Sequence, residues 1–275
     1  MGTTGPGSTE TSGTGSSTGA AECVKTVVLM GYWPPTNEML RPFSTDPQLN
    51  PDGWQGENWR GLGFDVHAFF PEFPPDGDPS NDPIGSPGSV GVGDLQVDYQ
   101  DTSADFWSIV DTLQPHIIIT HSRGGSIGWE IEAIEGGHGS GGPNPAFDWI
   151  SDGFGAQTRP TEDSVDPRSW AAMNTYRDVN AQSLLPLAEI EAAADALAVT
   201  DVQIDATGTS GNYLSGFLGL HGIVYVESTP HAVAGGHIHV GIGLPVEDAQ
   251  ALTEASLEAV LAAHPVETLE CPTPG

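Results

Sequence analysis

Short apolar stretches of strand length recur along the chain, with turn-rich or amphipathic segments between them. Apolar side chains dominate the runs at 25–30, 63–70 and 116–120, and unbroken runs of this kind are typical of parallel strands that are covered on both faces. Two further stretches, 202–205 and 234–241, have the same extended, apolar character. We therefore predict a strand at each of these five places.

Another segment, residues 126–134, alternates strictly between apolar and polar positions. Ile127, Trp129 and Ile131 fall on one face of an extended chain, whereas Glu130 and Glu132 fall on the other. A period of two residues predicts a strand with one polar face.

Apolar residues at helical spacing predict helices over 105–113, 169–180, 187–197 and 246–263. A further helix is expected to begin near Ser215, directly after a turn of small residues. Strands that alternate with helices indicate an α/β fold whose sheet is covered on both faces. No internal repeat or later linker is visible, so we expect a single domain over 23–275.

The charge of the chain is strongly unbalanced and narrows the range of partners. The sequence has 37 acidic and seven basic residues, which gives a formal net charge of -30. Such a chain would be repelled by nucleic acid and by anionic membranes, and the acids are spread as on a solvated surface. No stretch has the apolar length of a transmembrane segment. A small molecule, a peptide or a polymer remains as the expected substrate.

The two ends of the chain carry features of an exported protein. Residues 1–22 are rich in Gly, Ser and Thr, so we expect a disordered tether there. Cys23 and Cys271 flank the expected domain, and a disulfide between them fits an even cysteine count, although two free thiols would give the same count. The tether is similar to the spacer of a secreted or periplasmic protein, or of a processed lipoprotein.

Residues 208–243 hold two halves of a nucleophilic site. Ser215 would lie in the first turn of a helix, where free N–H groups and the helix dipole favour negative charge. His237 and His239 are two residues apart on an extended run, so both point to the same face of a strand. Either histidine is a candidate base for Ser215.

A rival nucleophile follows the strand at 116–120. Ser122 lies in His-Ser-Arg-Gly-Gly, which resembles the nucleophile elbow of the α/β-hydrolases and would indicate an esterase or lipase. An elbow requires a helix directly after the serine, yet residues 126–134 alternate like a strand. We weigh Ser122 as an alternative to Ser215.

Metal binding is a third possibility. His231, His237 and His239 could ligate zinc together with a carboxylate. Residues 76–82 are rich in oxygen ligands but lack the spacing of an EF-hand, so a solvated loop is the better interpretation. We expect no metal and no cofactor.

Six short motifs occur in the order found in pyroglutamyl peptidase I, the pyrrolidone-carboxylate peptidases, and the chain resembles that family over about residues 26–245. The resemblance implies a three-layer αβα sandwich around a mostly parallel or mixed sheet, with a cysteine–histidine–acid triad. The motifs are Val-Leu-Met-Gly-Tyr-Trp-Pro (28–34), Pro-His-Ile-Ile-Ile (115–119), Gly124-Gly125 with Glu132, Leu-Pro-x3-Ile (185–190), Ser-Gly-Asn-Tyr-Leu-Ser-Gly (210–216) and Gly-His-Ile-His-Val (236–240).

The resemblance assigns roles to particular residues. Ser215 matches the family's nucleophilic cysteine, His239 its base and Glu132 its acid, with Glu130 as the acid if the loop is shifted, and His237 as a pocket residue. The family's loop arginine is Ser126 here, the Asn after its nucleophile is Gly216 and its first-loop Phe-Glu-Pro-Phe is Tyr-Trp-Pro-Pro at 32–35. These departures affect specificity for pyroglutamate more than the hydrolase chemistry.

The sequence therefore predicts a secreted, metal-independent serine hydrolase that cleaves an amide or ester bond through an acyl-enzyme. Two further groups complete the hypothesis: an oxyanion site from the backbone at Gly124, Gly125 and Gly211, and a substrate pocket that includes Tyr32, Trp33 and Tyr213. The alternative from another class is an extracellular binding domain without catalytic activity, in which Ser215 only begins a helix.

Overall fold

The computed structural model describes residues 1–2, 23–33, 35–78, 93–97, 99–125, 128–135, 181–208 and 214–273. Within them, a six-stranded sheet has the order β2-β1-β3-β8-β4-β7. The strands are β1 (Lys25–Gly31), β2 (Phe64–Phe69), β3 (Ile117–Arg123), β4 (Trp129–Glu132), β7 (Val202–Asp205) and β8 (Ala234–Val240), and a small second sheet pairs β5 (Ile134–Glu135) with β6 (Ala181–Gln182).

The main sheet is mixed. Strands β2, β1, β3 and β8 are parallel to one another, and β4 runs antiparallel to β8 and parallel to β7. The strands predicted from apolar runs at 25–30, 63–70, 116–120 and 202–205 are confirmed to within a few residues. Within the described part of the alternating segment, Trp129–Glu132 is confirmed as a strand, with Trp129 and Ile131 fully buried in the core.

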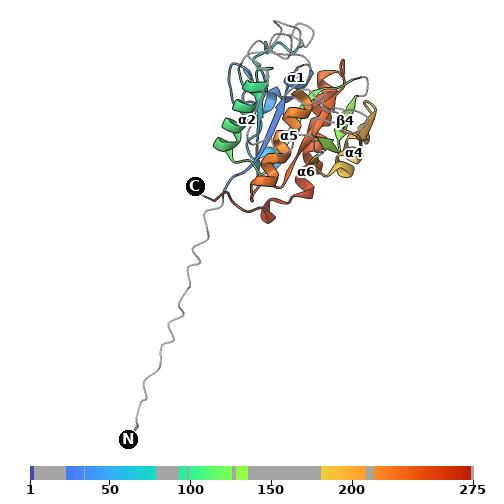
Figure 1. Ribbon diagram of the computed structural model, residues 1–275. Coiled ribbons are helices and arrows are strands. Elements are labelled where there is room, and N and C mark those ends of the chain that lie inside the picture. Colours follow the sequence, from blue (N-terminus) through green and yellow to red (C-terminus); the bar gives the residue numbers. More distant parts are fainter. Residues whose placement is uncertain are drawn as a thin grey trace.

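Helices cover both faces of this sheet, which makes the predicted three-layer αβα fold (Figure 1). On one face, α1 (Thr36–Leu40), α4 (Leu187–Asp195) and α6 (Val246–Ala263) pack in one core cluster. On the other, α2 (Tyr99–Leu113) and α5 (Leu214–Ser228) pack in a second cluster. Among the described residues, short 3-10 helices lie at Arg41–Phe43, Trp59–Gly61 and Val266–Thr268.

Helix α5 packs against the sheet through glycines. Gly222 faces Ile118 on β3, while a Cβ on Gly235 of β8 would come within 2.8 Å of the Gly222 carbonyl oxygen. Further along the helix, a Cβ on Gly219 would lie only 2.9 Å from the Cβ of His237. Small residues on both partners therefore let α5 approach the sheet closely.

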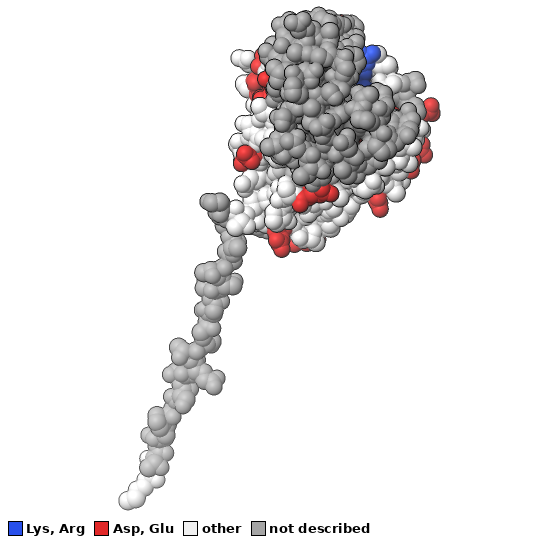
Figure 2. Space-filling model, viewed as in Figure 1, with Lys and Arg blue, Asp and Glu red and all other residues white. Residues whose placement is uncertain are grey.

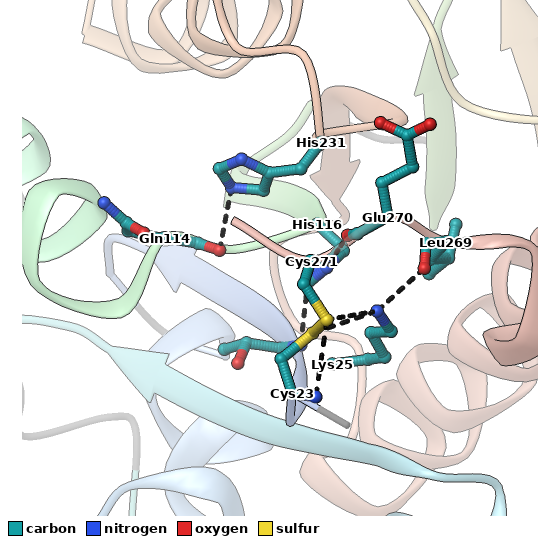
Figure 3. Close-up of a disulfide and its surroundings, with 9 residues drawn as sticks. Cys23, Lys25, Gln114, His116, His231, Leu269, Glu270 and Cys271 are labelled. Carbon is teal, nitrogen blue, oxygen red and sulfur yellow. Dashed lines mark hydrogen bonds between the residues drawn. A yellow bond between two sulfur atoms is a disulfide. The ribbon is translucent and has the colours of Figure 1, made fainter. Parts of the chain in front are cut away.

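The two ends of the described domain are joined beside β1, as Figure 3 shows. Cys23 and Cys271 form a disulfide across a sequence separation of 248 residues, which the sequence predicted. The buried ammonium group of Lys25, the single lysine of the chain, donates to the Cys23 Sγ at 3.0 Å and to the Leu269 carbonyl at 2.8 Å. The covalent link is thus reinforced by a buried charge-assisted contact.

Acidic side chains lie on several sides of the described surface, as the net charge of -30 leads one to expect (Figure 2). Arg60 contacts two acids of α6, Glu254 at 2.6 Å and Glu258. None of the described helices has the length and apolar character needed to cross a bilayer. The predicted helix over 169–180 and most of the predicted tether lie outside the described residues.

Candidate active site

Polar side chains share one face of the sheet where β3, β8, β4 and β7 lie side by side. Cross-strand register pairs Thr120 with His237 and Ser122 with His239, and alternation keeps all four on the same face. The opposite face of these strands carries core residues such as Ile131 and Ile238. A polar layer therefore lies between the sheet and the helix layer formed by α2 and α5.

The central contact of this layer joins a histidine to a glutamate. Nδ1 of His239 lies 2.9 Å from Oε1 of Glu132, which is fully buried. Glu132 comes from β4, which is antiparallel to β8. A buried carboxylate on Nδ1 fixes the tautomer and orientation of an imidazole, and it directs Nε2 toward any reacting group.

Two more acids surround the same imidazole. Glu130 lies directly across from His239 in the register, with Oε2 3.9 Å from Nδ1. Its other oxygen accepts a hydrogen bond from Gln203 at 2.8 Å. Asp205, one strand further, accepts two hydrogen bonds from Thr207, both at 2.7 Å.

Burial dominates the electrostatics of the site. Desolvation lowers the pKa of His239 to about 4, while Glu130 and Asp205 oppose that shift. Burial also lowers the pKa of His237 well below its ordinary value, with contributions from His239 and His121. Both imidazoles are therefore neutral at neutral pH, which is the form a general base requires.

A second hydrogen-bonded group lies beside this one. Nε2 of His237 is 2.8 Å from the hydroxyl of Ser122, and its Nδ1 is 2.7 Å from the hydroxyl of Thr120. The rings of His237 and His239 meet edge to face, with centroids 4.9 Å apart. All of these side chains are at most slightly exposed.

Ser215 is the second residue of α5 and is half-buried. The first N–H groups of a helix have no partner within the helix, and its N-terminal end carries partial positive charge. The predicted position in a first helical turn is therefore confirmed.

Comparison of the sequence with protein-family models and with curated proteins finds no match. Solved structures do match. A pyrrolidone carboxyl peptidase from Thermococcus litoralis has a TM-score of 0.56 at 12% identity, with 91% of this chain and 100% of that chain covered. A mutant pyrrolidone carboxyl peptidase from Pyrococcus furiosus has a TM-score of 0.52 at 13% identity, with 87% and 99% covered. The fold is that of the pyrrolidone carboxyl peptidases.

Within the pyrrolidone carboxyl peptidase fold, the oxyanion role predicted for Gly124 is wrong. Its N–H donates to the carbonyl of Val240 at 2.5 Å, so this donor is already used in the strand pairing. A Cβ at Gly124 would lie 3.0 Å from the Cβ of His239. The glycine is therefore explained by close packing against the histidine. Gly125 accepts a long hydrogen bond from the N–H of Ile242, at 3.4 Å.

The described residues around Ser122 also differ from the nucleophile elbow that was considered as an alternative. Ser122 lies inside β3 and is almost completely buried, and the next described element is strand β4. A nucleophile elbow places its serine on a sharp turn between a strand and a helix. The strand-like alternation of residues 126–134, seen in the sequence, already argued against that turn.

The residues predicted to line a substrate pocket lie in different surroundings. Tyr32 is fully buried, and its hydroxyl lies 2.6 Å from that of Thr102 on α2, so the structure gives it a place in the core rather than in an open pocket. Trp33 is half-buried, with a left-handed backbone just before α1. Gly211 and Tyr213 lie outside the described residues.

The zinc site considered for three histidines is wrong. His231 lies near the disulfide, where its Nε2 is 3.0 Å from the carbonyl of Gln114 and its ring packs against His116 (Figure 3). In the part of the chain that is described, the group with suitable ligand atoms is instead Glu130, Glu132 and His239, all within 4.8 Å of one another.

Three polar residues of the site were not singled out from the sequence: Thr120, Gln203 and Asp205. Each lies at an alternate position of a strand, which is the signal the sequence offered. Their proximity depends on the strand order β3-β8-β4-β7, which no local pattern encodes.

Proposed function

We propose that the protein is a serine hydrolase that cleaves an amide or ester bond, with Ser215 as nucleophile, His239 as general base and Glu132 as the orienting acid. The observation that carries the proposal is the 2.9 Å contact between the buried Glu132 carboxylate and Nδ1 of His239. A catalytic triad needs such a contact between its base and its acid, and a carboxylate beside Nδ1 leaves Nε2 available to a nucleophile.

The packing register of α5 supports Ser215 as the partner of that nitrogen. Gly222 packs beside Gly235 and Gly219 beside His237, so the helix and β8 run in opposite directions. Ser215 lies one turn before Gly219, about 6 Å along the helix axis. His239 lies two residues after His237, which is a similar distance of about 7 Å along the strand. The same register thus brings Ser215 to the level of His239.

The position of Ser215 also suits its proposed chemistry. The N-terminal end of a helix presents N–H groups that have no partner within the helix itself, and such groups can donate to the oxyanion of a tetrahedral intermediate. We therefore take the oxyanion donors from the start of α5 and not from Gly124, because the N–H of Gly124 already donates to the carbonyl of Val240. The helix dipole adds to the stabilisation of negative charge at the same point.

The reaction follows from these roles. Nε2 of His239 takes the proton of the Ser215 hydroxyl while Oγ bonds to the substrate carbonyl carbon, and the imidazolium then gives that proton to the departing amine or alcohol. The acyl-enzyme is hydrolysed when His239 takes a proton from water, whose oxygen bonds to the same carbon; the imidazolium then returns that proton to Oγ of Ser215 as the ester C–O bond breaks and the acid is released. Glu132 stabilises the imidazolium in both steps.

The class of substrate is a small molecule or a peptide. The matching structures are named pyrrolidone carboxyl peptidases, so amides and esters of pyrrolidone carboxylic acid are the first compounds to screen. The disulfide between Cys23 and Cys271 fits an oxidising compartment. We place the protein outside the cytoplasm on that ground, where a serine nucleophile resists the oxidation that inactivates a cysteine.

Covalent labelling tests the proposal directly. A fluorophosphonate should add to the wild-type protein at one site, as measured by intact mass, and Ser215→Ala should abolish that addition. The matched comparison is Ser122→Ala, which removes a buried serine next to His237 and should keep the site of labelling, although at a lower rate. Loss of labelling in Ser122→Ala alone would favour the esterase alternative, and no labelling of any variant would favour a binding domain.

A metal-dependent hydrolase is the second candidate, because Glu130, Glu132 and His239 bring three ligand atoms within 4.8 Å. A metal held there could activate a water molecule. Elemental analysis separates the two candidates: stoichiometric zinc that survives dialysis, and that a chelator removes together with activity, would favour the metal. Full fluorophosphonate labelling in chelator would favour the serine.

A further inference from the structure

His237 has both of its ring nitrogens bonded to hydroxyl groups of the neighbouring strand β3. Its Nδ1 is 2.7 Å from Oγ1 of Thr120, and its Nε2 is 2.8 Å from Oγ of Ser122. Neither hydroxyl belongs to the proposed triad. The arrangement therefore needs a reason of its own.

Counting protons decides which tautomer this arrangement holds. The Thr120 hydroxyl donates its proton to the carbonyl of Gly236 at 3.0 Å, so toward Nδ1 it can only accept. Nδ1 of His237 must then carry the ring proton. Because burial keeps this imidazole neutral, Nε2 is an acceptor and receives the proton of the Ser122 hydroxyl. The hydroxyl of Ser122 is thereby used as a structural donor.

The ring held in this way has little freedom to move. A Cβ on Gly219 of α5 would lie 2.9 Å from the Cβ of His237, so the helix closes the space above the strand at this residue. The ring of His237 in turn meets the ring of His239 at 4.9 Å and an interplanar angle of 90°. His239 is therefore confined by Glu132 at Nδ1 and by His237 at its side.

We propose that His237 is a positioning residue, held as the Nδ1–H tautomer by Thr120 and Ser122, and that it fixes the ring plane of His239. The inference rests on the proposed function, since it explains how Nε2 of His239 is kept in line with Ser215. A general base must be aligned with the proton that it removes, and small misplacements reduce the rate strongly.

Substitution of Thr120 separates this role from packing. Thr120→Val keeps the side-chain shape but removes the acceptor for Nδ1–H, so His237 should shift to the Nε2–H tautomer and its hold on His239 should loosen. Thr120→Ser keeps the hydroxyl and serves as the matched control. Circular dichroism of both variants should be that of the wild-type protein.

Nitrogen NMR of the histidine side chains reads the tautomer without any need for activity. The wild-type protein and Thr120→Ser should show a protonated Nδ1 at His237, assigned by its loss in His237→Phe, and Thr120→Val should show a protonated Nε2. The Nδ1 signal of His239, which lies 2.9 Å from Glu132, should broaden or shift in Thr120→Val alone. A protonated Nε2 in the wild-type protein, or an unchanged His239 signal in Thr120→Val, would overturn the inference.

Labelling kinetics then measure the consequence. The maximal rate of fluorophosphonate labelling should fall about tenfold in Thr120→Val, with the half-saturating concentration unchanged, and should be restored in Thr120→Ser. A wild-type rate in Thr120→Val would overturn the positioning role while leaving the proposed function intact. If Ser215 is unlabelled in every protein but the NMR changes occur, the proposed function fails and the positioning of His239 by His237 stands.

Discussion

Glu132 of β4 and His239 of β8 are joined by a 2.9 Å contact between a fully buried carboxylate and Nδ1 of the imidazole. They are diagonal neighbours across an antiparallel pair, because Glu130 and not Glu132 lies directly opposite His239. The diagonal contact is thus shorter than the direct one, at 3.9 Å. Under the proposed function, this contact makes Glu132 rather than Glu130 the acid that orients the base.

We predict that Glu132→Gln lowers the rate of fluorophosphonate labelling by about three orders of magnitude, because an amide favours the wrong imidazole tautomer and cannot stabilise an imidazolium. Glu130→Gln is the matched control on the same face of β4, and we expect a loss of tenfold or less. Both rates are measured by quenching the labelling reaction at successive times and determining the labelled fraction from the intact mass of the protein. Equal losses in the two variants would contradict the assignment of Glu132.

The pH profile of labelling should reflect the lowered pKa of His239, which is about 4. A base with a lowered pKa stays neutral until the pH falls to that value, so the rate should be constant from pH 7 to about 5 and fall to half near pH 4. Glu130 raises this pKa, so Glu130→Gln should move the midpoint to lower pH. A wild-type midpoint near 6.5, the ordinary value, would contradict the description.

Folding stability has a related dependence on pH. Burial lowers the pKa of His121 and His221 to about 4 as well, whereas an unfolded histidine titrates near 6.5. Between these values the unfolded chain binds more protons, so the free energy of unfolding should decrease as the pH falls from about 6.5 to 4, by up to about 1.4 kcal/mol per pH unit for each such histidine. Urea titrations of the wild-type protein and of His221→Gln should show a smaller decrease in the variant. Identical slopes would refute this account.

Gly219 and Gly222 offer a matched pair of tests for the packing of α5. A Cβ at Gly219 would meet the Cβ of His237 and the carboxyl carbon of Glu135, each at 2.9 Å, whereas a Cβ at Gly222 would meet nothing nearer than 3.5 Å. Gly219→Ala should destabilise the protein by about 1–3 kcal/mol and slow labelling. Gly222→Ala should stabilise it by about 0.5–1 kcal/mol. Chemical denaturation measures both, and equal effects would show that the helix does not pack as described.

The disulfide should contribute strongly to stability because it closes a loop with a sequence separation of 248 residues. Chain entropy predicts a loss of about 5 kcal/mol when both cysteines are replaced by serine. Reduced wild-type protein is the control, since it lacks the bond but keeps the sulfur atoms near Lys25. A denaturation midpoint that is the same in oxidised and reduced protein would contradict the prediction.

Local patterns were sufficient for most of the fold. The apolar run at 116–120 and the amphipathic pattern at 246–263 correspond to β3 and α6 because both elements bury the apolar residues that create the pattern. Helix α1 was missed, since it follows Pro34 and Pro35 and has only five residues. Helix α2 begins at Tyr99 rather than at 105, because its first turns carry polar residues that helical spacing does not mark.

The site could be predicted only in part. His239 and Glu132 were found by motif order, whereas Asp205 and Thr120 depend on which strands become neighbours, and that order is a property of the whole sheet. The error at Gly124 has the same origin: its N–H is taken by Val240 of β8, which is distant in sequence. Long-range pairing therefore decides both the successes and the failures.

The pairing of Ser215 with His239 is the centre of the account, and a thiol placed at Ser215 tests it most directly. The described part of the protein has no free cysteine, and Cys23 and Cys271, the two cysteines of the sequence, are bonded to each other, so Ser215→Cys introduces a single reactive group. Its alkylation rate by iodoacetamide should be measured against pH in Ser215→Cys and in the double variant with His239→Asn. A thiol next to this imidazole and at a helix N-terminus should show an apparent pKa well below 8.5 that rises toward 8.5 without His239. An apparent pKa near 8.5 in both proteins would contradict the triad.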